Sequence, residues 1–173
     1  MLGWDENLKC GLGPWMSLCT TMISLDLIRR TGWSCESERK VISEDAYSLL
    51  KLYLNLESAV VINNCYYHYI ARTRLLSLSW REDRFQRIKE NHSSMMNIVQ
   101  EAGIAEECKQ AICSQYLDYL IAYYKSVLST KKGTGDQYEL IKYTLFDNEN
   151  QRIMRGLNNR TLGLKKRIMR RPL

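Results

Sequence analysis

Hydrophobic positions after residue 80 recur at helical spacing. Between residues 105 and 131 they lie three and four residues apart, which places them on one face of a helix: Ile112, Tyr116, Tyr119, Leu120, Tyr123, Tyr124 and Leu128. Glycines at 103, 133 and 135 separate this stretch from its neighbours, so we expect helices near residues 81–102, 105–131 and 136–156. Their short connections predict an antiparallel helical bundle.

Upstream of this bundle the pattern predicts a buried helix followed by strand. Ser43 is a good N-cap, and residues 44–56 behind it are apolar on almost every side, which is typical of a helix packed all round. The following segments 59–62 and 65–70 are dense in β-branched and aromatic residues. That composition predicts a strand or a bent pair of strands.

The beginning of the chain predicts one more strand and a short helix. Residues 15–23 have a composition that suits a strand. Residues 24–30 then predict a helix that Ser24 caps and Gly32 ends. The fold class that follows is α+β and mostly α, with a small sheet before the helical bundle.

Composition supports one ordinary folded chain with three parts. At 173 residues and 45% hydrophobic content the chain is long and apolar enough to bury a core. We expect a mixed lobe over residues 1–80, the helical bundle over 81–156, and a tail over 157–173.

The net charge of +6 comes from the end of the chain. Residues 151–173 hold six Arg and two Lys and no acid, which leaves −2 for residues 1–150. The tail also alternates apolar and basic side chains, so it predicts an amphipathic helix that contacts an anionic membrane surface. The alternative is a solvated, disordered terminus. A near-neutral body with no recognition motif predicts no specific nucleic-acid binding.

The spacing of the cysteines and the length of the apolar runs predict where the protein is located. The six cysteines include no Cys-x-x-Cys pair and no histidine at zinc-site spacing, so we expect reduced thiols and no metal site. The sequence begins with neither a basic start nor an apolar stretch, and its uncharged runs are too short to cross a bilayer. We therefore expect a cytoplasmic protein, peripheral at the inner face of the membrane if the tail binds there.

The candidate chemistry begins at Glu44 and Asp45. If Ser43 caps the helix, Asp45 lies in its first turn, where backbone N–H groups and the helix dipole favour an ionised carboxylate. An ionised carboxylate is what a general base requires. The alternative is that both acids only decorate a helix start, as a second Glu-Asp pair at residues 82 and 83 would.

The order of parts carries a resemblance. A strand and short helix over residues 19–28 precede a loop, and Glu44-Asp45 then opens a buried helix. A strand follows that ends in Tyr67-His68-Tyr69, and after it comes an Arg-x-x-Ser-x-Ser segment over 74–79. Over roughly residues 11–80 this order resembles the C-terminal half of family-two glycosyltransferases, inverting enzymes with a GT-A fold that build bacterial capsules and exopolysaccharides.

The resemblance implies a fold and a set of roles. The sheet would be the remnant of a GT-A C-terminal lobe, Asp45 would be the catalytic base, and Glu44 would hydrogen-bond the acceptor. Groups suited to a donor diphosphate would lie on a mobile segment, namely Arg72, Arg74, Ser77 and Ser79. The alternative for the two arginines is that they cap strand ends and face solvent. The implied partners are a nucleotide-sugar donor and a saccharide or lipid-linked acceptor.

Two departures from the family limit what this chain does alone. Thr21 stands where the family usually shows Lys, and neither a nucleotide-binding front half nor an Asp-x-Asp motif is present. Mg²⁺ or Mn²⁺ is therefore expected in a full-length relative but not in this chain, which we expect to be inactive by itself.

Two further expectations concern partners. A missing lobe would leave apolar surface around Trp15, Met16 and Val60, which favours self-association. The rival hypothesis is a non-catalytic helical module whose tail binds a membrane or an acidic partner.

Overall fold

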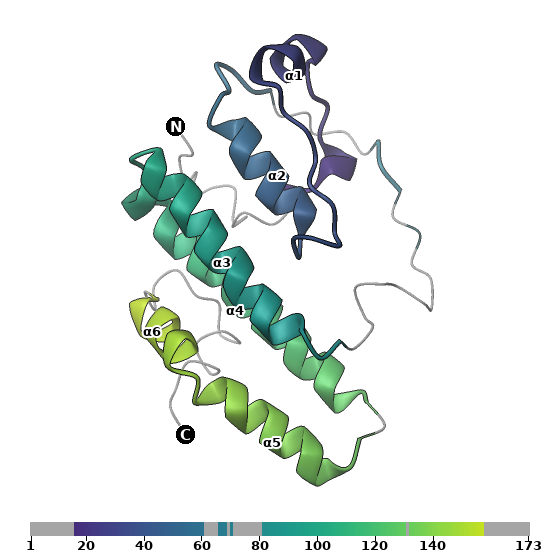
Figure 1. Cartoon of the computed structure of the whole chain (residues 1–173). Coiled ribbons are helices and arrows are strands. Elements are labelled where there is room, and N and C mark those ends of the chain that lie inside the picture. Colours follow the sequence, from purple (N-terminus) through teal and green to yellow (C-terminus); the bar gives the residue numbers. More distant parts are fainter. Residues whose placement is uncertain (1–15, 61–65, 69, 71–80, 131, 158–173) are drawn as a thin grey trace.

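The computed structural model describes residues 16–60, 66–68, 70, 81–130 and 132–157, and within these ranges the chain is mostly helical (Figure 1). A short 3-10 helix, η3, spans Leu18–Thr20. Six α-helices follow it, namely α1 (Leu25–Thr31), α2 (Glu44–Tyr53), α3 (Arg84–Glu101), α4 (Ala105–Leu128), α5 (Thr134–Leu145) and α6 (Asn148–Gly156). The mostly α part of the expected fold class is confirmed, and the described ranges contain no strand, so the expected sheet remnant is not found there.

The prediction of a strand over residues 15–23 is wrong for its described part. Backbone N–H groups of Thr20 and Thr21 bond back to the carbonyls of Ser17 and Leu18 at 3.2 Å, which closes a 3-10 turn. Met16 is buried against α2. Met16, Leu18 and Ile23 of this segment therefore pack in the cluster around α2, whereas Met22 is exposed.

The second predicted sheet region gives the same result where it is described. Residues 59, 60, 66–68 and 70 have no regular secondary structure, and Val60 is 86% exposed. Residues 61–65 and 69 of that prediction lie outside the described residues. β-Branched and aromatic composition favours a strand only when a partner strand and a packed face are available.

Two helix ends confirm the signals expected from the sequence. Ser24 occupies the N-cap position of α1 but its side chain makes no capping hydrogen bond, and Gly32 closes that helix in the left-handed region at φ 61°. Between α3 and α4, Gly103 has φ 73°, its N–H bonds the carbonyl of Gln100, and the N–H of Ile104 bonds that of Val99. This pair of bonds is a Schellman motif, which reverses the chain within three residues and makes α3 and α4 antiparallel.

The expected helix over residues 136–156 is in fact two helices. Asp147 has extended backbone angles, φ −61° and ψ 129°, and its side chain accepts a hydrogen bond from the N–H of Asn150 at 2.9 Å. An aspartate in this geometry starts a new helix, because it satisfies one of the N–H groups that a first turn leaves unpaired. The chain therefore turns between α5 and α6.

α4 is the central element of the bundle. Figure 1 shows α3 and α4 lying side by side along most of their length, with α1 and α2 on one side and α5 and α6 on the other. α2 contacts α3, and both α5 and α6 contact α4. The antiparallel helical packing expected from the sequence is present.

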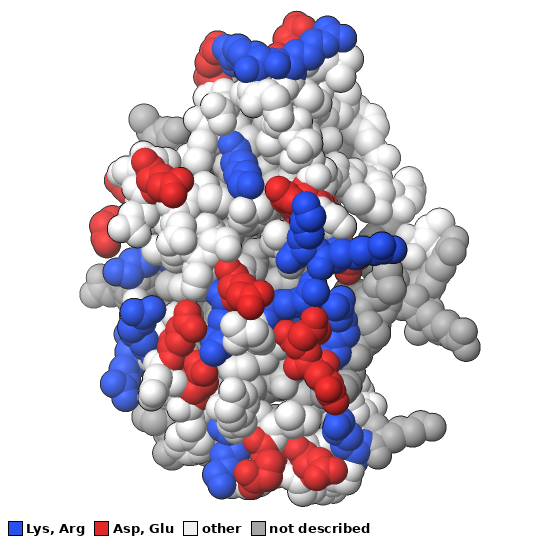
Figure 2. Space-filling view, in the orientation of Figure 1, with Lys and Arg blue, Asp and Glu red and all other residues white. Residues whose placement is uncertain are grey.

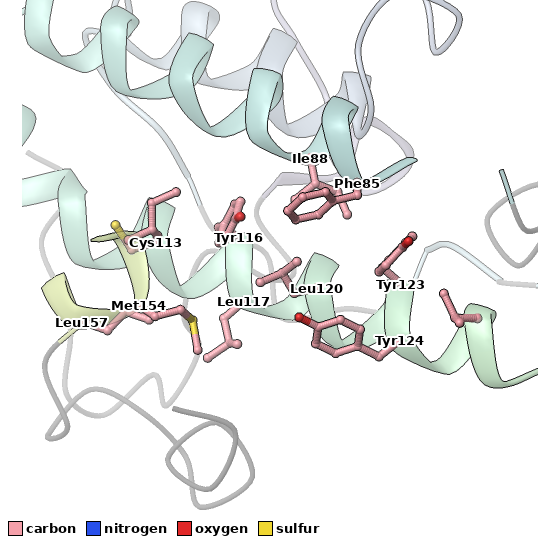
Figure 3. Packing of buried hydrophobic residues seen from close by; sticks show 12 residues of the cluster. Phe85, Ile88, Cys113, Tyr116, Leu117, Leu120, Tyr123, Tyr124, Met154 and Leu157 are labelled. Carbon is pink, nitrogen blue, oxygen red and sulfur yellow. The ribbon is translucent and has the colours of Figure 1, made fainter. Parts of the chain in front are cut away.

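The buried hydrophobic residues form two clusters along the α3–α4 pair. The first joins the beginning of α3, most of α4 and α6, and Figure 3 shows Phe85 and Ile88 on one side of α4 and Met154 on the other. The second joins Met16 and α2 to the end of α3 and the beginning of α4. Each cluster contains side chains of both α3 and α4. Therefore α2 packs against the same pair of long helices as α6.

A buried polar network fixes α6. The ammonium group of Lys89 on α3 lies 2.9 Å from a carboxylate oxygen of Asp147 and 3.8 Å from one of Glu149. The side-chain amide of Asn150 donates to the carbonyl of Thr144 at 2.7 Å, and Thr144 is bonded to the phenol of Tyr124. Thr144, Asn150 and Tyr124 are almost completely excluded from water, so these groups depend on their partners to offset the cost of burial, whereas Lys89 and Asp147 are partly exposed.

Candidate functional site

Glu44 and Asp45 occupy the first turn of α2, directly after Ser43, whose backbone conformation is unusual. Ser43 has φ 56° and ψ 52°, and among the described residues it alone combines a side chain with a positive φ. This left-handed conformation is disfavoured for serine, and strain of this kind often occurs at functional sites. Ser43 is the N-cap residue, as expected, but its side chain makes no capping hydrogen bond.

Asp45 is hydrogen-bonded to two residues that precede it in the sequence by 28 and 27 positions, Ser17 and Leu18. Its Oδ2 atom accepts a hydrogen bond from the backbone N–H of Leu18 at 3.2 Å and one from the hydroxyl of Ser17 at 3.4 Å. These two bonds hold the Asp45 side chain in place. The first turn of α2 adds the favourable field of the helix N-terminus.

Glu44 lies in a different environment from its neighbour. Burial has the largest effect and raises the pKa of the Glu44 carboxyl, its own backbone N–H opposes this, and the nearby charges of Asp45 and Glu38 raise the pKa further. A carboxyl with a raised pKa binds a proton more readily near neutral pH. The pair therefore combines a carboxylate anchored by hydrogen bonds with a carboxyl whose pKa is raised by burial.

Tyr119 of α4 completes the described part of the site. Its hydroxyl is hydrogen-bonded to that of Ser43. Burial raises the pKa of Tyr119 to about 12, and the charges of Asp118, Glu44 and Asp45 contribute to the increase. The phenol is thus neutral at physiological pH and is available as a hydrogen-bond donor or acceptor beside the acid pair.

Sequence reasoning missed the contributions of Ser17, Leu18 and Tyr119. Tyr119 was expected only as a core residue, because it recurs at helical spacing with other tyrosines. Leu18 bonds Asp45 through its backbone N–H, so the residue type at position 18 does not predict the bond. Glu44 and Asp45 are brought together as the sequence predicts, at the start of a helix.

The four expected diphosphate ligands, Arg72, Arg74, Ser77 and Ser79, lie outside the described residues. Next to that segment, Arg81 and Arg87 both bond Asp83, at 3.2 Å and 2.7 Å. Arg87 also donates to the carbonyl of Arg39 at 3.0 Å, which connects the start of α3 to the loop that leads into α2. Guanidinium groups therefore occur at the start of α3, close to the chain that carries the acid pair.

A cysteine and a histidine also meet inside the bundle. Sγ of Cys113 lies 3.6 Å from Nε2 of His92, across the α3–α4 contact. Sequence spacing does not predict this pairing, since the residues are on different helices. Burial raises the pKa of the Cys113 thiol and lowers the pKa of His92 to about 4. Both groups are therefore neutral at physiological pH, which is the opposite of an activated thiolate and imidazolium pair.

The described residues offer no cation site of ordinary composition. Within them, no group of three or more His, Cys, Asp or Glu side chains could hold a metal ion. In the same ranges, none of the helices combines the length and the apolarity that a bilayer crossing requires.

Comparisons of the chain with protein-family models, with curated proteins and with solved structures found no match.

Proposed function

We propose that this chain is the acceptor-side C-terminal portion of an inverting glycosyltransferase that moves a sugar from a nucleotide-sugar to a saccharide or lipid-linked acceptor in polysaccharide biosynthesis. The observation that carries the proposal is the anchored carboxylate of Asp45 in the first turn of a buried helix. The substrate class comes from the resemblance over residues 11–80, of which the Glu44-Asp45 helix start is present and the strands are absent from the described residues.

In the complete enzyme Asp45 acts as the general base. Its free oxygen takes the proton of the acceptor hydroxyl while the acceptor oxygen bonds to the anomeric carbon and the bond to the diphosphate oxygen breaks. The leaving diphosphate departs with the electron pair of that bond. Glu44 and Tyr119 orient the acceptor through hydrogen bonds beside the base.

The implied Mg²⁺ or Mn²⁺ does not fit the described residues of this chain. They contain no cluster of ligands suited to a divalent ion, and the whole sequence lacks an Asp-x-Asp motif. We assign no step to a metal here, and neutralisation of the leaving group belongs to the donor-binding part of the complete enzyme.

The test uses two matched aspartates. Asp26 and Asp45 are both the second residue of a helix, but Asp26 is exposed and bonded only within α1. We expect Asp45→Asn to lower the sugar-transfer rate by roughly a hundredfold or more when the chain is fused behind the donor-binding lobe of a family-two glycosyltransferase. Asp26→Asn should leave the rate unchanged. Near-normal transfer by the folded Asp45→Asn protein would refute the base assignment.

Acceptor binding gives a test that needs no donor lobe. Saturation-transfer NMR of the chain with a panel of neutral and acidic oligosaccharides should show contacts that Glu44→Gln weakens and Asp26→Asn does not. The reading frame upstream of Met1 offers a second check, since a strand–turn–helix pattern with Asp-x-Asp there would supply the donor half.

A non-catalytic helical module is the second candidate. One observation favours it, because the bonds from Leu18 and Ser17 to Asp45 also explain this carboxylate as a structural link between η3 and α2. A loss of stability in Asp45→Asn with no saccharide binding by the wild-type chain would favour the module.

A further inference from the structure

The side of α5 that faces away from the bundle carries a stripe of four residues along the helix. Gly135, Glu139, Lys142 and Phe146 follow one another at intervals of four, three and four residues, so they lie on one line of the helix surface. Phe146 is the C-cap residue, but its N–H still bonds the carbonyl of Lys142 at 3.0 Å and continues the helical line. All four residues are exposed.

Two tyrosines border this stripe, one on each side. Tyr138 is 62% exposed and Tyr143 is 67% exposed. The opposite side of α5 already holds the helix in place, because Leu140 and Ile141 pack against the first hydrophobic cluster and Thr144 is fully buried. A group of large aromatic side chains at this exposure marks an interaction surface.

The order of residues in the stripe is self-complementary. The pair Gly135 and Phe146 and the pair Glu139 and Lys142 have the same midpoint, between residues 140 and 141. A two-fold axis through that midpoint, perpendicular to α5, would lay Glu139 of each copy against Lys142 of the other and Phe146 against Gly135. Nothing lies within 4 Å of the place that a Cβ atom of Gly135 would take, so a ring has room there.

We propose that this stripe is an isologous contact between two copies of the chain, in which the two α5 helices pack antiparallel. Within one copy Lys142 already lies 3.7 Å from Glu139, but the two side chains are 48% and 68% exposed. An ammonium group has three donors and a carboxylate has two acceptor oxygens, so each can also bind the second copy. The four groups then alternate in charge across the contact.

The charge of the stripe favours a second copy over other occupants. Glu139 and Lys142 cancel, and Figure 2 shows acidic and basic side chains interspersed over one face of the molecule, including the lower edge where Figure 1 places α5. A polyanion such as a nucleic acid or an acidic membrane gains nothing from such a surface. An unrelated protein would have to match the stripe in reverse order, whereas a second copy does so by symmetry.

The size of the surface predicts a weak dimer. The rings of Tyr138, Tyr143 and Phe146 each expose about two thirds of an area of 150–250 Å², or roughly 300–450 Å² together. A standard interface takes about 800 Å² from each partner. We therefore expect a dissociation constant of roughly 10–500 μM, so the chain is monomeric at the low concentrations of denaturation experiments. This inference goes beyond the proposed sugar transfer and does not rest on it.

The experiment is sedimentation velocity of the full chain at increasing concentration. Wild type should shift from monomer to dimer, and Glu139→Lys or Lys142→Glu should each raise the dissociation constant roughly tenfold or more, because like charges then face one another across the two-fold axis. Asp26→Lys is the matched control. It makes the same change in net charge and breaks an exposed pair of the same spacing on α1, Asp26 with Arg29, and it should dimerise like wild type.

A mixture of the two charge variants separates a contact between copies from an effect within one copy. When Glu139→Lys and Lys142→Glu chains are mixed, opposite charges face one another again across the axis, although the pair within each copy stays broken. We expect the mixture to dimerise about as tightly as wild type while each variant alone stays monomeric. A mixture of Asp26→Lys with Lys142→Glu should not regain the dimer, which excludes a general attraction between chains of different net charge.

Three results would overturn the proposal. The first is a wild-type chain that stays monomeric over the whole concentration range, even if it binds another protein or a vesicle. The second is a dimer that both charge variants, shown to be folded by circular dichroism, leave intact, since the contact would then lie elsewhere. The third is no association in the mixture while wild type dimerises. Sugar transfer by a fused enzyme is measured separately, so its failure leaves this test intact.

Discussion

The backbone N–H of Leu18 donates to Oδ2 of Asp45 at 3.2 Å, and this bond joins the η3 segment to the first turn of α2. It explains why Met16 packs beside α2 and not in a sheet. The same bond gives the carboxylate a fixed position, which a catalytic base needs and which a structural link also needs.

The first prediction separates the stability effect of Asp45 from that of an ordinary helix-start aspartate. Asp45→Ala removes an acceptor from the Leu18 N–H and from Ser17, so it should lower the free energy of unfolding by about 1–2 kcal/mol. Asp26→Ala should have little effect, because Asp26 is exposed. Urea denaturation monitored by circular dichroism measures both. Equal losses in the two variants would mean that the Leu18 bond contributes nothing.

The second prediction concerns the pH dependence that His92 imposes. Burial, together with the charge of Arg152, lowers the pKa of His92 to about 4, whereas an unfolded chain titrates near 6.5. The unfolded state therefore binds more protons between these values, and stability should fall as the pH decreases from about 6.5 to about 4. His92→Gln should reduce this slope. An unchanged slope in denaturation curves across that range would contradict the buried neutral imidazole.

The third prediction tests the network that fixes α6. Burial alone would raise the pKa of Asp147, but the hydrogen bond from Asn150 and the charge of Lys89 outweigh it and lower the pKa. The resulting stability is complete above the unfolded value of about 3.8 and is lost as the pH falls through the lower folded value. Asp147→Asn should cost about 1–2 kcal/mol at neutral pH and should unfold with a flatter acid dependence. Glu139→Gln, an exposed pair partner on α5, is the control.

The fourth prediction compares two glycines that flank α4. Gly103 has φ 73°, so Gly103→Ala should cost about 1 kcal/mol even though open space surrounds the new methyl group. Gly133 precedes α5 with φ −60°, so Gly133→Ala should change stability by less than about 0.5 kcal/mol. Thermal melts decide between them. A neutral Gly103→Ala would show that the chain reversal does not need a left-handed residue.

The sequence predicted the helical elements well where the signal is local. Gly103 and Gly32 end helices through their own backbone freedom, and the tyrosine spacing marks the buried face of α4. The sequence does not predict the break at Asp147. Within a helical pattern a capping aspartate has the same residue type as an ordinary surface aspartate, and only its hydrogen bond with the N–H of Asn150 identifies the start of a new helix.

Where the predicted strands are described, they are absent for a physical reason that composition does not contain. Residues 15–23 suit a strand, but Met16, Leu18 and Ile23 pack in the cluster around α2, and the N–H of Leu18 bonds Asp45. The acid pair itself was predicted at a helix start. The hydrogen bond between Ser43 and Tyr119 could not be predicted, since it depends on how α2 packs against a helix more than sixty residues later.

Both hydrophobic clusters draw on the same two long helices, so neither half of the molecule has a core of its own. Melting α4 anywhere near Ile112 and Cys113 removes side chains from both clusters together. Cooperative loss of the entire assembly is the consequence, and amide protons in the middle of α4 should exchange with deuterium only when every helix opens.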